Sequence, residues 1–185
     1  MFQQFLAIGT LIFSLSVIGI AQLHISQNKT FLADIANTQK QVSIQMYTLL
    51  LRPVFPDIRE IHLITSTKLP KGHVPFMIYT GQNEIFFVDQ ITPSMLCQNC
   101  NLFTFLMIVN SAGQVWKIHP LNRLMSGSAI IDLSPFLQQI IKKSVENNLL
   151  LGQDIFTNKS LSIYYELLLE PVRESFRIFK EYRNV

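Results

Sequence analysis

The first 28 residues of this 185-residue chain contain no Asp, Glu, Lys or Arg. Inside this stretch, residues 5–23 are almost entirely apolar, and a helix of that length would span roughly 28 Å, close to the thickness of the hydrocarbon core of a bilayer. Eleven of these 19 positions hold Leu, Ile, Phe or Val, each of which favours membrane insertion by about 0.3–0.6 kcal/mol near a helix centre. The sequence therefore predicts a single transmembrane anchor over residues 1–25.

A signal peptide that is later removed is the alternative interpretation of this segment. Signal peptides begin with basic residues and have a shorter apolar core, whereas residues 1–4 carry no charged side chain. Gly19 and Ala21 would nevertheless suit cleavage after a small residue. We expect the anchor to be retained, and the retention of residues 1–21 stays open at this point.

The chain also has little charge and lacks the common catalytic motifs. Charged residues make up only 15% of the sequence, and its 15 basic residues, against 12 acidic ones, do not cluster, which argues against nucleic acid as a partner. There is no glycine-rich phosphate loop, no nucleophile elbow and no metalloprotease helix motif. The sequence thus offers no catalytic residue, and we favour a non-catalytic role.

Residues 26–56 are expected to form a helical stem, and residues 57–185 a single domain. Apolar spacing and turn residues predict the elements of both parts. They are a helix over 29–52 ended by Pro53, a strand over 58–65, hairpins turning at 81–83 and at 110–113, a helix over 135–145 with Ser134 as its N-cap, and a helix from 160 that Pro171 interrupts. This order of elements indicates an α+β fold with an antiparallel sheet and flanking helices.

The order of parts between residues 103 and 169 resembles the FMN-binding domain family. That family occurs in the flavin-carrying subunits of Rnf complexes and of the sodium-pumping NADH:quinone reductase. The similar parts are a hairpin with a turn glycine, FTFLMIVNSAGQVWKIHPL, a helix that begins near Phe136 and Leu137, and the later segment LLGQDIFTNKSLSIYYELL. The resemblance implies one membrane helix followed by an extracytoplasmic α+β domain in a membrane electron-transfer complex.

In that family a loop threonine carries FMN through a phosphoester bond. At the corresponding place this chain offers Thr157 and Ser160 as the hydroxyls for cofactor binding, but the family's Gly-Ala pair is absent. Residues 126–129, Ser-Gly-Ser-Ala, look closer to the motif by composition, yet they precede the Phe136 helix and contain no threonine. We therefore expect no cofactor, with FMN on Thr157 as the alternative.

Cys97 and Cys100 are the only cysteines. Three interpretations remain open: a small structural disulfide or paired thiols, half of a metal site completed by a partner chain, or a redox-active pair. We favour the first, because no second cysteine pair exists and the four histidines show no ligand spacing. A disulfide suits an oxidising compartment, which together with the family topology favours a domain on the periplasmic side.

These observations lead to one expected function and two alternatives. We expect a membrane-anchored accessory subunit, built on a degenerate FMN-binding-like domain, whose partners are the membrane and other subunits of a membrane complex. The first alternative is an active flavoprotein that transfers electrons through FMN. The second is an extracytoplasmic thiol–disulfide protein that uses Cys97 and Cys100.

Removing residues 1–25 should release the chain from membranes while leaving the domain folded. The physical reason is that the apolar segment supplies several kcal/mol of favourable insertion energy, whereas a single Lys or Asp at its centre costs about 2.5–3.5 kcal/mol. An Ile12→Lys change in the intact chain should therefore weaken insertion as well. Membrane fractionation after a high-salt wash measures both effects, and a truncated chain that still pellets with membranes would show that the anchor is not the main attachment.

Overall fold

The computed structural model describes residues 41, 43–66, 68–158 and 160–183. The chain consists of two units that divide between Leu50 and Leu51. In the first unit residues 43–50 are helical. The expected anchor over residues 1–25 and the stem from 26 to 40 lie outside the described residues. None of the helices in the described ranges is long and apolar enough to span a bilayer.

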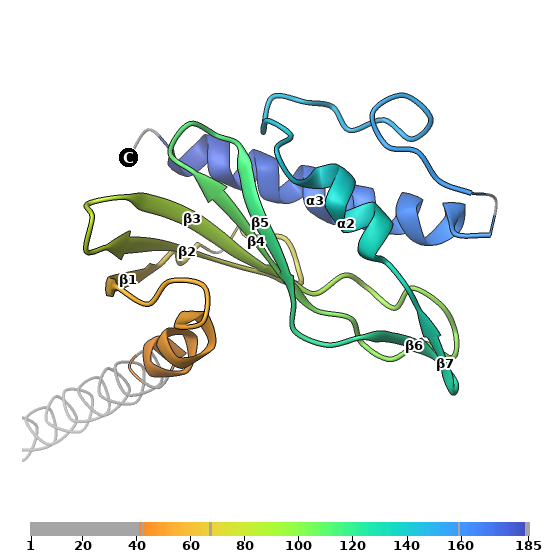
Figure 1. Cartoon of the computed structure of the whole chain (residues 1–185), viewed down its shortest axis with the longest axis horizontal. Helices are drawn as coiled ribbons and strands as arrows, with labels where there is room; N and C mark the ends of the chain where they lie inside the picture. The colour runs from red at the N-terminus through yellow and green to blue at the C-terminus, as the bar shows by residue number, and fades with distance from the viewer. Residues whose placement is uncertain (1–40, 42, 67, 159, 184–185) are drawn as a thin grey trace, which may run out of the picture. The chain divides into compact units, whose positions relative to one another are not determined.

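The second unit is built on a five-stranded antiparallel sheet whose strands follow one another in chain order (Figure 1). The strands are β1 (Ile58–Leu63), β2 (His73–Thr80), β3 (Ile85–Ile91), β4 (Phe105–Asn110) and β5 (Val115–Pro120). Each neighbouring pair is antiparallel, and both predicted hairpins, β2–β3 and β4–β5, are present. The predicted α+β class and antiparallel sheet are therefore confirmed.

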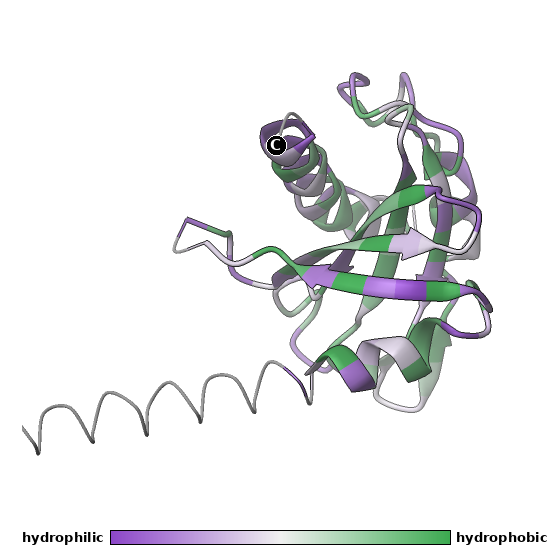
Figure 2. Cartoon of the chain, turned by 90° about the vertical axis from the view of Figure 1, so that its left-hand side faces the viewer, coloured by the Kyte–Doolittle hydropathy of each residue, from purple (hydrophilic) through white to green (hydrophobic). Residues whose placement is uncertain are grey.

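Burial along the strands explains which part of the sheet is central. In β4 the five residues from Phe105 to Val109 are all buried, so both faces of this strand are covered, which is why it is a continuous apolar run. The edge strand β1 instead has polar residues between Ile58 and Ile61 that stay exposed. In Figure 2 apolar and polar residues accordingly alternate along strands that have one face in solvent.

One face of the sheet packs against α3 (Ser162–Tyr182), the long C-terminal helix (Figure 1). The aromatic rings of Phe87 on β3 and Phe179 on α3 meet edge-to-face, with centroids 5.4 Å apart. The register places Phe87, Asp89 and Ile91 on this same face of β3, because alternate residues of a strand share a face. This layer between helix and sheet is the core of the domain.

The predicted interruption of the C-terminal helix at Pro171 is wrong, since α3 is continuous from Ser162 to Tyr182. Proline has no backbone N–H to donate and usually breaks a helix interior. Here the residues on both sides of it, Leu168, Leu169 and Val172, are buried against the core. Burial of these side chains outweighs the lost hydrogen bond and keeps the two halves in one helix.

The prediction for the helix over 135–145 is wrong at both ends. The helix α2 runs only from Ser134 to Ile140. Its N-cap residue is Leu133, with no side-chain cap, so Ser134 lies inside the first turn rather than capping it. Asp132 instead accepts a hydrogen bond from the Ser134 N–H at 2.9 Å, and hydrogen bonds from the side chain and backbone of Ser134 hold the pKa of Asp132 below its usual value.

Sheet pairing ends α2 early. Lys142 adopts a positive φ of 70°, and its N–H donates to the carbonyl of Val115 on β5 at 2.7 Å. The Val115 N–H donates in turn to the carbonyl of Lys143, and the Val145 N–H to that of Gly113. Residues 142–145 thus satisfy backbone groups of β5 and its turn, a tertiary requirement that the helical spacing of the sequence does not contain.

A small second sheet, absent from the sequence prediction, precedes α2. It consists of β6 (Leu124–Ser126) and β7 (Ala129–Ile131), which pair antiparallel. The turn between them contains Gly127 at a φ of +58°, a conformation that glycine adopts without steric cost. Residues 126–129, which resembled the family's flavin loop by composition, are therefore a hairpin turn.

Replacing Gly72 by alanine should destabilise the domain more than replacing Gly127. Both residues have positive φ values, so each substitution carries a backbone cost of about 1–2 kcal/mol. A Cβ on Gly72 would also lie 2.2 Å from the carbonyl oxygen of Thr92, whereas nothing lies within 4 Å of one on Gly127. In urea denaturation we expect Gly72→Ala to lower the free energy of unfolding by about 1–3 kcal/mol more than Gly127→Ala does. Equal decreases in the two variants would contradict the close approach of Gly72 to Thr92.

Candidate functional site

Thr157 and Ser160 lie in the loop that leads into α3, but their hydroxyls bond to neighbours. Thr157 Oγ1 donates to the carbonyl of Asn158 at 3.0 Å, and Ser160 Oγ donates to Oδ1 of Asn158 at 2.8 Å. The same Oδ1 accepts the backbone N–H of Leu161, a donor that a phosphate at this helix end would need. The local geometry therefore does not fit a phosphate held between Thr157 and Ser160.

Thr157 also bonds to the side chain of Tyr165, one turn inside α3. Burial raises the pKa of Tyr165, while the Thr157 hydrogen bond lowers it and the Asp132 carboxylate raises it. The Tyr165 ring packs against Phe136 of α2 with centroids 4.8 Å apart. Thr157 thus helps to seat α3 on α2, and FMN attachment at this residue stays a prediction.

Cys97 and Cys100 form a disulfide in the structure. Cys100 is buried in the domain core, and it pairs with Ser126 of β6 in an isolated bridge. The Sγ of Cys97 lies 3.6 Å from Oγ of the same Ser126. The disulfide loop is therefore packed against the small β6–β7 sheet, a position that suits a brace between two segments.

Two asparagines complete the attachment of this loop to the small sheet. Asn101 donates its side-chain N–H to the carbonyl of Arg123 and accepts the N–H of Met125, while Asn122 accepts the N–H of Thr104. Together, residues 95–102 and 122–131 form what we call the disulfide arm, which extends away from the five-stranded sheet in Figure 1. Residues 97–101 do not form the haem-attachment motif Cys-x-x-Cys-His, because position 101 is asparagine. The Asn101 side chain instead holds the loop to the small sheet.

A buried acid–histidine cluster, which the sequence analysis missed, joins the sheet to α3. Nδ1 of His73 on β2 lies 2.6 Å from Oδ2 of Asp89 on β3, and both side chains are almost fully buried. Nε2 of His73 lies 3.4 Å from Oε2 of Glu174 on α3, which is partly exposed. The strand register explains this meeting: Pro75 is opposite Asp89, so His73 is its diagonal neighbour on the same face.

The geometry of this cluster favours a structural role over proton transfer. Both ring nitrogens of His73 face carboxylates, so neither is free to meet a substrate. Oδ1 of Asp89 has no hydrogen-bond partner among the described residues, which makes this carboxylate costly to bury without His73. The sequence signal was present, because Asp89 is the single charged residue inside the apolar strand IFFVDQI, but pairing it with His73 required the register.

No group of three or more His, Cys, Asp or Glu residues suited to a metal ion occurs in the described ranges. Trp116 on β5 is 44% exposed and stacks on Phe55 with centroids 5.3 Å apart. Like Trp116, His119 lies on β5, outside any cluster of ligand side chains. These residues therefore add no second chemical site to the described part of the chain.

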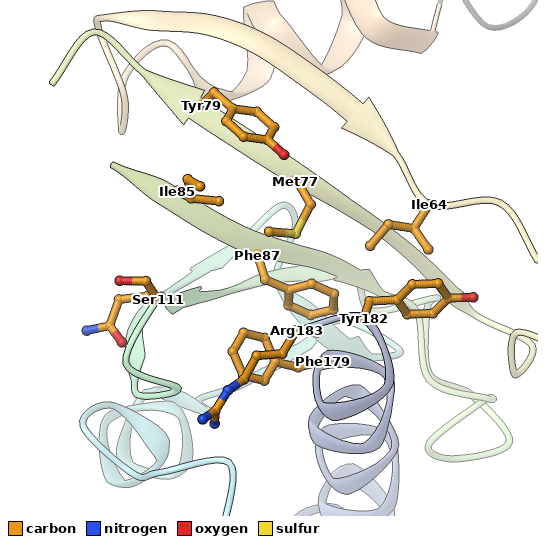
Figure 3. Close-up of a pocket in the computed structure, with 10 residues that line it drawn as sticks. Ile64, Met77, Tyr79, Ile85, Phe87, Ser111, Phe179, Tyr182 and Arg183 are labelled. Carbon is orange, nitrogen blue, oxygen red and sulfur yellow. The ribbon is translucent and has the colours of Figure 1, made fainter. Parts of the chain in front are cut away.

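An apolar cleft of about 490 Å³ lies between the sheet and the C-terminal end of α3. In Figure 3, Met77 and Tyr79 of β2 and Phe87 of β3 point toward Phe179 and Tyr182 of α3. The other lining residues are Ile64, Ile85, Asn110, Ser111 and Arg183. This volume lies within the usual range of roughly 300–1,000 Å³ for small-molecule sites, and the sequence analysis did not identify it because its walls come from five separate segments.

Comparison of the chain with protein-family models, with curated protein sequences and with solved structures returns no match.

Replacing Asp89 by alanine should cost about 3–5 kcal/mol of unfolding free energy, because it leaves the enclosed His73 without its partner. The exposed pair of His62 and Glu60 on β1 provides the matched control, and Glu60→Ala should cost less than about 1 kcal/mol. A double variant, His73→Leu with Asp89→Leu, should recover much of the loss because it removes both polar groups. Urea denaturation in mild detergent measures the free energy of unfolding of all three variants. If Asp89→Ala lowers it no more than Glu60→Ala does, the buried pair does not stabilise the domain as we expect.

Proposed function

We propose that the chain is a membrane-anchored, non-catalytic subunit that holds its second unit against other subunits of a membrane complex. The apolar segment over residues 5–23 supports the membrane attachment. The family resemblance of residues 103–169 supports an electron-transfer complex as its setting. Enzymatic activity has no support in the described residues, because their one buried acid–histidine cluster is closed on both sides of the imidazole ring.

The observation that carries this proposal is the apolar surface of the disulfide arm. Met95, Leu102 and Ile130 are 64%, 60% and 57% exposed, respectively. A single exposed apolar residue is ordinary, but three large ones on one projecting element favour a contact with another protein. Such surfaces become the buried core of an interface when a partner covers them.

The construction of the arm supports the same role. The Cys97–Cys100 disulfide closes a short loop within the first segment, and the bridge from Cys100 to Ser126 and the side-chain bonds of Asn101 join that loop to the second segment. These ties fix the arm before binding, which lowers the entropic cost of association. The disulfide in this interpretation is structural, and its position beside a β-hairpin rather than a helix N-terminus gives a thiol–disulfide activity no support.

A double variant, Leu102→Asp with Ile130→Asp, should abolish co-purification of partner subunits from detergent-solubilised membranes. Charged residues placed in an apolar interface remain unpaired and desolvated there, so binding should fall at least about tenfold. Ile163→Asp is the matched control, since Ile163 is equally exposed at 61% but lies on α3, and this variant should keep the partners. Affinity purification with quantitative mass spectrometry measures the set of subunits.

Two outcomes of this experiment would contradict the proposal. If the wild-type chain elutes as a lone monomer after gentle extraction, it is not a subunit of a complex. If the Ile163→Asp variant loses its co-purifying subunits to the same extent as the double variant, the arm is not the docking surface. The absorbance spectrum of the same preparation tests the flavoprotein alternative. A fluorescent flavin band that stays with the denatured chain and disappears in Thr157→Ala would replace the proposal with that alternative.

A further inference from the structure

We propose that the cleft between β2, β3 and the end of α3 binds a small aromatic carboxylate. This site is separate from the disulfide arm and from the acid–histidine cluster, none of whose residues line it. The proposal rests on three features of the cleft: its aromatic walls, its polar groups and its single charge. It does not depend on the subunit role proposed above.

Aromatic side chains form the two facing walls. Tyr79 and Phe87 project from the sheet, and Phe179 and Tyr182 project from α3 on the other side (Figure 3). Met77 and Ile85 fill the remainder of the sheet wall. Phe87 and Phe179 already meet edge-to-face with centroids 5.4 Å apart, so a flat ring would lie over this pair rather than between its members. There it would make offset-stacked or edge-to-face contacts, which are favourable beyond the burial of apolar area alone.

The polar groups of the cleft are suited to an acceptor. Oδ1 of Asn110 already accepts the N–H of Gln114 at 2.9 Å, so its amide N–H₂ is the group left to donate. Ser111, beside it in the β4–β5 turn, adds a hydroxyl. A ligand that meets these residues should therefore carry hydrogen-bond acceptors at that end, as a carboxylate does.

Charge gives the strongest argument for an anion. Arg183 is the only charged residue among the ten that line the cleft, and it makes no ion pair with any residue in the described ranges. Its Nη1 lies 3.8 Å from the place that a Cβ on Gly113 would occupy, so the guanidinium lies beside the β4–β5 turn that also carries Ser111. A guanidinium binds a carboxylate through two parallel N–H donors. The acid end of the ligand is thereby placed at the turn and its ring against the aromatic side chains of the cleft.

Calorimetric titration of the full-length chain in nanodiscs with 2-naphthoate tests the proposal. We expect saturable binding with one site per chain, and little or no binding of 2-naphthylmethanol, which has the same ring without the charge. Hexanoate, which has the charge without the ring, should bind at least about tenfold more weakly. Absence of saturable 2-naphthoate binding at millimolar concentration, or equal binding of the alcohol or of hexanoate, would overturn it.

Variants then locate the site. Arg183→Gln should weaken 2-naphthoate binding about tenfold or more, and Arg183→Lys should restore part of the loss because it keeps the charge but not the paired donors. Arg177→Gln is the matched control, since this arginine lies on α3, the helix that Arg183 caps, but bonds to Glu170, and the variant should bind as the wild type does. Ile85→Glu should reduce binding far more than Ile85→Gln, because it places a second negative charge in the cleft. Unchanged affinity in both Arg183→Gln and Ile85→Glu, with unchanged unfolding temperatures, would place the ligand elsewhere and overturn the assignment.

Discussion

The exclusion of water from one face of the sheet by a single long helix is the constraint on which the rest of the domain depends. The helix α3 supplies the buried side chains that complete the core over β3 and β4. Because that layer is dry, Asp89 needs the imidazole of His73 beside it. The same layer explains why Pro171 is tolerated, since the residues around it gain more from burial than the helix loses in hydrogen bonding. The buried Asp89 and the continuous α3 thus have the same tertiary cause.

The place where α3 ends determines where the domain is open. Phe179 and Tyr182 reach the sheet at its β2–β3 side, but the helix stops there, so Met77 and Tyr79 face a cleft rather than a packed layer (Figure 3). The disulfide arm lies away from this end of α3 (Figure 1). Because the two surfaces are separate, a ligand in the cleft and a partner on the arm could be bound at the same time. The acid–histidine cluster contributes to stability and not to either surface.

The residue types in the sequence indicated some of the candidate site residues but not the contacts that these residues make. The sequence favoured a disulfide or paired thiols at Cys97 and Cys100 among three interpretations, and the structure contains the disulfide. Thr157 was a candidate because its loop resembles the flavin-attachment loop of the FMN-binding domain family, yet its hydroxyl is engaged with Asn158 and Tyr165, contacts that only the folded loop creates. Asp89 was visible as a charge inside an apolar strand, but its partner lies 16 residues earlier in the chain, at a distance that no local pattern specifies. No pattern in the sequence indicates the cleft, since its walls are mostly ordinary core-forming residues that come from separate segments.

Short-range patterns by themselves determined the types of the main helices and strands of the domain, though not the small β6–β7 sheet. Apolar runs rich in β-branched and aromatic residues, separated by glycine-containing turns, predicted the β2–β3 and β4–β5 hairpins, because strand preference and turn geometry are local properties. The tertiary structure decided where elements end and what they meet. It stopped α2 at Ile140 so that residues 142–145 could satisfy the backbone of β5, and it carried α3 through Pro171. It also brought His73, Asp89 and Glu174 together from three elements. The physical reason is that burial and hydrogen-bond satisfaction are summed over the whole fold, whereas periodicity and turn preference are read within a few residues.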